Sequence, residues 1–387
     1  MTIFRILNIV TILLLLGCSA KPIVYEALVV PAKAKASNST SSHLKSEQND
    51  AKQQFALGSK YYNGEGVAQN YTEAVKWFRL AADQGDADAQ FLLGSMYSNG
   101  EGVTKNYTEA AKWYRIAANQ GDAAAQLILG MMYYHGQGVA QSFTEAEKWL
   151  RLAANQGDAD AQQYLGFMYK YGKGVAQNYT EAAKWYRLAA DQGDPKAQSN
   201  LGLMYNNGQG VAQNYTEAVK WYRLAADQGN AGAQTNIGHL YSDGKGVAQN
   251  YTEAAKWYRL AADQGTKQAQ LSLGWYYMNG FKNLPKESVD YGQAVYWNQR
   301  AADNGSAEGF NNLGWLYENG LGVKRNLAKA AELYQVAVTN GIKDGNKKEN
   351  IEEAKSRLAA LQSKKKTSNM IPLKAKMPNN DPLNIRD

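Results

Sequence analysis

The chain has 387 residues, of which 44% are hydrophobic and 20% charged, and its formal net charge is +7. This length suits one large domain or two ordinary ones. The basic excess lies at the two ends of the sequence, and the long central part is nearly neutral. A nucleic-acid-binding surface needs its basic residues along the folded body, so we expect no nucleic-acid partner. A single cysteine excludes an intramolecular disulfide framework.

The N-terminus reads MTIFRILNIVTILLLLGC, in which Arg5 precedes a short apolar run. Such a run is typical of a secretory signal and is too short for a comfortable transmembrane helix. Its end, Leu-Leu-Gly-Cys, resembles the lipobox of bacterial lipoproteins, which implies cleavage before Cys18 and acylation of that residue. Ser19 resembles the residue of the class sorted to the outer membrane. We therefore predict a signal peptide over residues 1–17 and an outer-membrane lipoprotein of the cell envelope, facing the periplasm or the cell surface. The alternative is an ordinary signal peptide followed by an accidental cysteine.

After the cysteine, the sequence is rich in Ala, Ser, Lys and Asn and shows no sustained periodicity. This composition indicates a flexible linker. We interpret residues 18–49 as the acylated cysteine and a tether that holds the folded part away from the membrane.

A 36-residue unit recurs from residue 50 to residue 341. Its clearest marker is a tryptophan at one spacing: Trp77, Trp113, Trp149, Trp185, Trp221 and Trp257. Repeats of this length are typical of solenoids, in which neighbouring units stack to share a core that none could form alone. The seventh unit carries a four-residue insertion in the loop at residues 281–290.

Each unit predicts two helices, here called A and B. In the second unit, Gln90, Leu93 and Tyr97 share one face of helix A, and a Gly-x-Gly loop follows. Helix B begins at Asn106, a good N-cap, and Glu109 three residues later completes a capping-box pattern. A glycine inside helix A, at position 94 in this unit, predicts that another backbone crosses closely.

The repeated pattern AxxLGxxYxxGxGVxxNxxxAxxWxxxAAxQG resembles the Sel-one-like repeat, a relative of the tetratricopeptide repeat. The resemblance covers about three quarters of the chain and implies an all-α, right-handed α/α superhelical solenoid of about eight helix-turn-helix repeats, with the A helices on its concave side. It also implies an adaptor that binds other proteins or peptides.

The unit changes near its C-terminal end. In the eighth copy Leu333 replaces the tryptophan and Lys329 replaces the capping glutamate, as expected of a terminal repeat. We predict a C-terminal capping helix over residues 342–363 and a basic disordered tail over residues 364–387.

Comparison of the copies with one another suggests a binding surface. Helix B is nearly constant, whereas helix A varies at three positions spaced i, i+4 and i+7, on a face that we place opposite the core. We predict that this concave face contacts the partner through these residues: Phe55, Phe91, Leu127, Met131, Tyr134, Phe167, His239, Trp275 and Trp315. Tolerated surface drift or packing adjustment is the competing explanation.

No catalytic motif stands out. The three histidines lie far apart, and the sequence contains no HExxH, paired cysteines or glycine-rich phosphate loop. We therefore expect no enzyme, no metal and no small-molecule cofactor, and we interpret the recurring glutamates of helix B as caps. Two alternatives stay open: an envelope hydrolase acting on cell-wall or β-lactam substrates, and a host-cell interaction factor.

Overall fold

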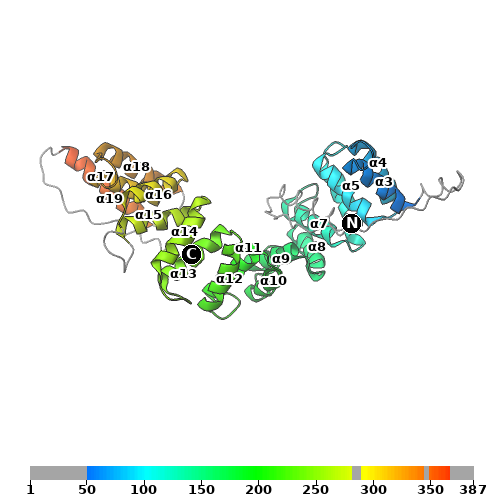
Figure 1. The fold of residues 1–387 in the computed structure, drawn as a ribbon, viewed down its shortest axis with the longest axis horizontal. Coiled ribbons are helices and arrows are strands. Elements are labelled where there is room, and N and C mark those ends of the chain that lie inside the picture. Colours follow the sequence, from blue (N-terminus) through cyan, green and yellow to red (C-terminus); the bar gives the residue numbers. More distant parts are fainter. Residues whose placement is uncertain (1–49, 281–288, 344–347, 367–387) are drawn as a thin grey trace. The chain divides into compact units, whose positions relative to one another are not determined.

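The computed structural model describes residues 50–280, 289–343 and 348–366 (Figure 1). Across these ranges the chain forms 17 helices and no strand. It divides into two compact units, which meet between Gln192 and Gly193. The predicted signal peptide, Cys18, tether and C-terminal tail lie outside the described residues, apart from the last turn of the final helix. No helix in the described ranges is both long enough and apolar enough to span a membrane.

Helices A and B alternate along both units, as predicted. In the first unit, the A helices are α3 (Ala51–Asn63), α5 (Ala87–Asn99), α7 (Ala123–His135) and α9 (Ala159–Tyr171). Their B helices are α4 (Tyr71–Asp83), α6 (Tyr107–Asn119), α8 (Phe143–Asn155) and α10 (Tyr179–Asp191).

The second unit repeats this order. Its A helices are α11 (Pro195–Asn207), α13 (Ala231–Asp243), α15 (Lys267–Asn279) and α17 (Ala307–Asn319). Its B helices are α12 (Tyr215–Asp227), α14 (Tyr251–Asp263), α16 (Tyr291–Asp303) and α18 (Leu327–Lys343), and α19 (Lys348–Lys366) follows.

Helix B begins at the predicted cap, but only half of the capping box forms. The Asn106 side chain accepts hydrogen bonds from the backbone N–H groups of Thr108 and Glu109, at 3.0 and 3.1 Å. The reciprocal bond is absent because the Asn106 N–H donates to the Tyr97 carbonyl at 2.8 Å. The Glu109 carboxylate instead pairs with Lys112 at 2.5 Å. The glutamate therefore supports its own helix, and the end of helix A caps helix B.

The glycine inside helix A makes room for a side chain. A Cβ atom at Gly166 would lie 2.6 Å from the Tyr186 ring, and one at Gly94 would lie 3.0 Å from the Tyr114 ring. The expectation of a crossing backbone is therefore wrong at these positions. The large residue of helix B fills the groove that glycine leaves, which is how the two helices of a repeat approach each other.

A chain of polar contacts joins consecutive repeats. The Gln90 amide donates to the Ala82 carbonyl of the preceding helix B at 3.0 Å. Gln120 then donates both to Gln90 Oε1 at 2.8 Å and to the Gly85 carbonyl at 3.0 Å. These two amides therefore link each repeat to the one before it.

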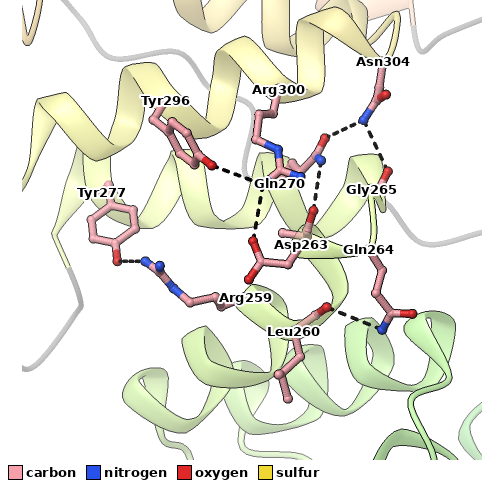
Figure 2. Close-up of polar contacts among 11 residues, drawn as sticks. Arg259, Leu260, Asp263, Gln264, Gly265, Gln270, Tyr277, Tyr296, Arg300 and Asn304 are labelled. Atoms are coloured by element: carbon pink, nitrogen blue, oxygen red, sulfur yellow. Dashed lines mark hydrogen bonds and ion pairs between the residues drawn. The ribbon is translucent and has the colours of Figure 1, made fainter.

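The same junction recurs near the C-terminal end with asparagine in place of the second glutamine. Figure 2 shows Asn304 donating to Gln270 Oε1 at 3.0 Å and to the Gly265 carbonyl at 3.3 Å. Beside it, Arg300 pairs with Asp263 at 3.3 Å. The side chains change, but the polar link between consecutive repeats is kept.

The first and last helices protect the open ends differently. In α3, Gln53, Ala56 and Lys60 are exposed where the second repeat has the buried residues Ala89, Leu92 and Met96. At the other end, α19 covers α18 with its buried residues Ala354 and Leu361. One end is thus made polar, and the other is covered by an extra helix. This helix begins later than residue 342, because α18 continues to Lys343.

Candidate protein-interaction surface

Four of the nine residues predicted to contact a partner lie in the interior. Phe91 and Met131 are 0% exposed, Leu127 is 1% exposed and Trp315 is 2% exposed. Helices α5 and α7 are buried around most of their circumference, because each packs against its own helix B and against the neighbouring repeats. The assumption that the varying face lies opposite the core is therefore corrected for these residues.

The varying positions of helix A surround the large residue of helix B in the same repeat. Phe91 lies 5.5 Å from Tyr114, between ring centroids, and Phe55 lies 5.6 Å from Phe78. In the third repeat, where Leu150 replaces the aromatic ring, Leu127 and Met131 belong to the same apolar core. Much of the variation is therefore packing adjustment around a residue that itself changes.

His239 has an internal role of this kind. Its Nδ1 lies 2.7 Å from the Tyr258 hydroxyl, and burial lowers the pKa of His239 to about 4. The imidazole is therefore neutral at pH 7 and shares a hydrogen bond with the tyrosine. Sequence comparison marks this histidine as variable, but its variation serves a partly buried hydrogen-bonded pair inside the repeat.

The other predicted residues remain partly accessible. Phe55, Tyr134, Phe167 and Trp275 are each of intermediate exposure. In the second unit, Trp275 packs edge-on against Tyr276, with ring centroids 5.5 Å apart. Two of these four residues, Tyr134 and Phe167, come together in the first unit.

An aromatic cluster lies at the last turns of α7 and α9. The ring of Tyr134 is 5.1 Å from that of Phe143 and 6.4 Å from that of Phe167, between centroids. Phe167 is 4.6 Å from Tyr171, and the Tyr171 side chain is 51% exposed. We call Tyr134, Phe143, Phe167 and Tyr171 the aromatic corner. A partly exposed group of rings of this kind is typical of binding surfaces.

Two lysines flank the aromatic corner. Lys173 Nζ lies 5.5 Å from the centroid of the Phe143 ring, and Lys170 Nζ lies 5.1 Å from that of Tyr171. Burial raises the pKa of the Tyr134 hydroxyl above its usual value, so this group is a hydrogen-bond donor at neutral pH. The corner therefore combines apolar rings with positive charge and a donor.

The sequence comparison missed Phe143, Tyr171 and Lys173. Phe143 is the first residue of helix B, a position treated as constant. Tyr171 occupies a position that holds Asn99 in the second repeat and Asp243 in the sixth. Comparing the copies at the end of helix A as well as along its face would have identified it.

The recurring glutamates of helix B form local ion pairs. Glu73 pairs with Lys76 at 2.6 Å, and Glu253 pairs with Lys256 at 2.9 Å. Within the described part of the chain, no three His, Cys, Asp or Glu side chains are grouped as a metal site would require. These carboxylates therefore have a structural explanation in the helix that carries them.

Paired helices that repeat every 36 residues and pack on their neighbours in each unit define an α-solenoid repeat protein. The sequence pattern of the Sel1 repeat matches eight times, at residues 54–86, 87–122, 123–158, 159–194, 195–230, 231–266, 267–306 and 309–342. The chain belongs to the Sel1 repeat family, and its fold is an all-α solenoid. Proteins of this family generally mediate protein–protein interactions, and they are typically non-catalytic scaffolds.

Two solved structures are similar to more than four fifths of this chain. One is c5321, described as a protective antigen present in uropathogenic Escherichia coli strains. It is 35% identical to this chain, covers 83% of it and 71% of its own length, and has a TM-score of 0.70. A Sel1 repeat protein from Oxalobacter formigenes is 30% identical, covers 85% of this chain and 96% of its own, and has a TM-score of 0.63. The comparison with curated proteins found no match.

Proposed function

We propose that this protein is an envelope-anchored scaffold that binds partner proteins or peptides through the aromatic corner of its first unit. The observation that supports this most strongly is the partly exposed cluster of Tyr134, Phe167 and Tyr171, flanked by Lys170 and Lys173. Aromatic side chains supply much of the binding energy at protein interfaces, because they bury a large area at a low entropic cost.

The proposed anchor is the acylated Cys18 at the end of the signal peptide. Several acyl chains on one residue hold a protein stably at a membrane, whereas a single chain does not. The polar tether of residues 19–49 would give the repeats access to partners beyond the membrane surface. In this proposal the protein acts by display and carries out no chemical reaction.

Photo-crosslinking in living cells tests the binding surface. A benzoyl-phenylalanine introduced at Tyr171 should crosslink to discrete partner proteins. The same group at Lys184, an exposed residue of helix B in the same unit, should not. The bands should disappear when Phe167 is changed to Ala. Identical patterns at both sites would show that the aromatic corner is not the binding surface.

Fractionation tests the anchor. The full chain should sediment with the outer membrane and incorporate a radiolabelled fatty acid, and the Cys18→Ala variant should do neither. A Cys18→Ala protein that still fractionates with membranes would contradict the lipid anchor.

A host-cell interaction factor is the second candidate. It is favoured by the likeness to an antigen described as protective, since a protective antigen must be reachable by antibodies. Proteolysis of intact cells distinguishes the two orientations: a surface-facing solenoid is digested, and a periplasmic one is digested only after the outer membrane is opened.

A further inference from the structure

We propose that the aromatic corner contains a receiving site for a carboxylate, formed by Tyr134 and Lys173, and that its ligand is an Asp or Glu side chain in a peptide segment of the partner. This proposal rests on the protein-binding function proposed above and names the chemistry of the partner. The internal repetition of the chain supports it, because at the equivalent position in the first two repeats a carboxylate of the chain itself accepts a hydrogen bond from the tyrosine.

The first two repeats show the filled arrangement. Tyr62, at the end of the first helix A, donates a hydrogen bond to Glu101 Oε2 at 3.0 Å. Its ring packs against that of Tyr71, with centroids 5.1 Å apart. Glu101 belongs to the Gly-x-Gly loop of the second repeat, so this carboxylate comes from the neighbouring repeat.

Residues 72 positions later occupy the same places in the third and fourth repeats. Tyr134 corresponds to Tyr62, Phe143 to Tyr71 and Lys173 to Glu101, and Tyr134 packs on Phe143 at the same centroid distance of 5.1 Å. The loops are seated alike, because a Cβ atom on Gly102 would overlap the Tyr71 carbonyl and one on Gly174 would overlap the Phe143 carbonyl. The acid has therefore been replaced by a base at an equivalent site.

The sixth repeat shows how such a lysine is satisfied within the chain. Lys245, equivalent to Lys173, lies 5.7 Å from the centroid of the Tyr215 ring and pairs with Asp243 at 2.8 Å. In the fourth repeat the residue equivalent to Asp243 is Tyr171, which has no charge. Lys173 is thus without the internal acid that Lys245 has.

Both polar ends of the corner are available to a ligand. In the part of the chain that the structure describes, Lys173 forms no ion pair and the Tyr134 hydroxyl forms no hydrogen bond. The segments around them, residues 131–142 and 168–178, contain no acidic residue. A carboxylate accepting from Tyr134 and pairing with Lys173 would complete the pattern that Tyr62 and Glu101 form internally.

The neighbouring rings define what should accompany the acid. Phe167 and Tyr171 lie together beside Tyr134, and Tyr171 is half exposed. An apolar side chain next to the acidic one in the partner segment can pack on these rings. The recognised motif is therefore an acidic residue adjacent to an apolar one.

Selection from a random dodecapeptide library, with the full chain held in detergent micelles, tests the proposal. Peptides selected by the wild-type protein should be enriched in Asp or Glu beside an apolar residue. A selected peptide, synthesised with a fluorophore, should bind at least about tenfold more weakly when its acid is changed to the matching amide. Lys173→Glu, which restores the internal acid, should weaken binding as much.

Lys245→Glu is the matched control, because it changes the net charge by the same amount and lies in the other compact unit. The affinity of this variant for the selected peptide should stay within about twofold of wild type. Circular dichroism confirms that both variants fold. Peptides selected without acidic enrichment, or equal binding by Lys173→Glu, would overturn the carboxylate site and leave the scaffold function standing. If no peptide is selected and no crosslink forms at Tyr171, both proposals fail together.

Discussion

The two helices of each repeat carry different kinds of information. Helix B is nearly the same in every central copy, yet it presents a large aliphatic side chain to solvent at one position, as in Leu80, Ile116 and Leu152, which are 42–47% exposed. Helix A varies from copy to copy, yet much of its variation is buried. Variation between internal repeats therefore marks co-adapted packing as readily as it marks a binding surface.

Two leucines on one helix B test the difference between its buried and exposed faces, and the expected effect on stability is the largest of those considered. Leu150 is fully buried and Leu152 is 42% exposed. Leu150→Ala should destabilise the first unit by about 2–5 kcal/mol, because it removes apolar contacts and leaves a cavity. Leu152→Ala should change the free energy of unfolding by less than about 0.5 kcal/mol. Urea titration followed by circular dichroism measures both, and similar midpoints would refute the assignment of the two faces.

The helix A glycines come next. Gly166→Ala should cost about 1–3 kcal/mol, since the new methyl group would meet the Tyr186 ring at 2.6 Å. Gly232→Ala is the control, because the nearest atom to its Cβ is 3.4 Å away, and alanine is the better helix former by about 0.5–1 kcal/mol. The melting temperature should fall for the first variant and rise for the second.

The partly buried pair of His239 and Tyr258 predicts a pH dependence of stability. The pKa of His239 is lowered to about 4 in the folded chain, below its unfolded value of about 6.5. The unfolded chain therefore takes up a proton between these values that the folded chain does not, and stability is lost as the pH falls through this window.

Replacing the pair by the residues of the third repeat, as His239→Met with Tyr258→Leu, should remove about 1–2 kcal/mol of that loss. The test is the difference between variant and wild-type urea midpoints at pH 7 and pH 4.5. The losses in the free energy of unfolding caused by the two single substitutions should add up to more than the loss in the double variant, because each single substitution leaves a neighbour that no longer fits. Strictly additive effects would show that the two positions are not co-adapted.

The smallest expected effect concerns the aromatic corner. Lys173→Glu should raise stability by a few tenths of a kcal/mol, because the new carboxylate can accept from Tyr134 as Glu101 does from Tyr62. Adding Tyr134→Phe to this variant should abolish the gain. A loss of stability in Lys173→Glu would mean that the two loops are not equivalent.

The sequence predicts most of the fold. The repeat period, the alternation of helices A and B, the asparagine cap of helix B and the glycine stop of helix A all follow from local rules. The surroundings of helix A do not, because a 3.6-residue period shows which residues share a face but not how many neighbours cover the helix. Phe91 and Met131 were misplaced for this reason. Trp315 shows the same limit, since a tryptophan is as suited to a core as to an interface.

The sequence alone identifies only part of the candidate site. Tyr134 and Phe167 come from the face that varies, whereas Phe143, Tyr171 and Lys173 come from a helix start, a helix end and a loop. Their meeting depends on how one repeat seats on the next, which no single helical period encodes.

The glutamine link between repeats has a consequence for how such a chain changes in length. Gln120 reaches the Gly85 carbonyl 35 residues earlier, and Gln156 and Gln192 reach Gly121 and Gly157 across the same interval. Removing or inserting a whole 36-residue unit leaves every donor facing an equivalent acceptor. The seventh unit, which is four residues longer in its loop, keeps the link as well, because Asn304 reaches the Gly265 carbonyl 39 residues earlier. The polar link therefore acts as a reading frame for the helices, and the chain can change in length by whole repeats or within a loop that leaves the paired helices in register.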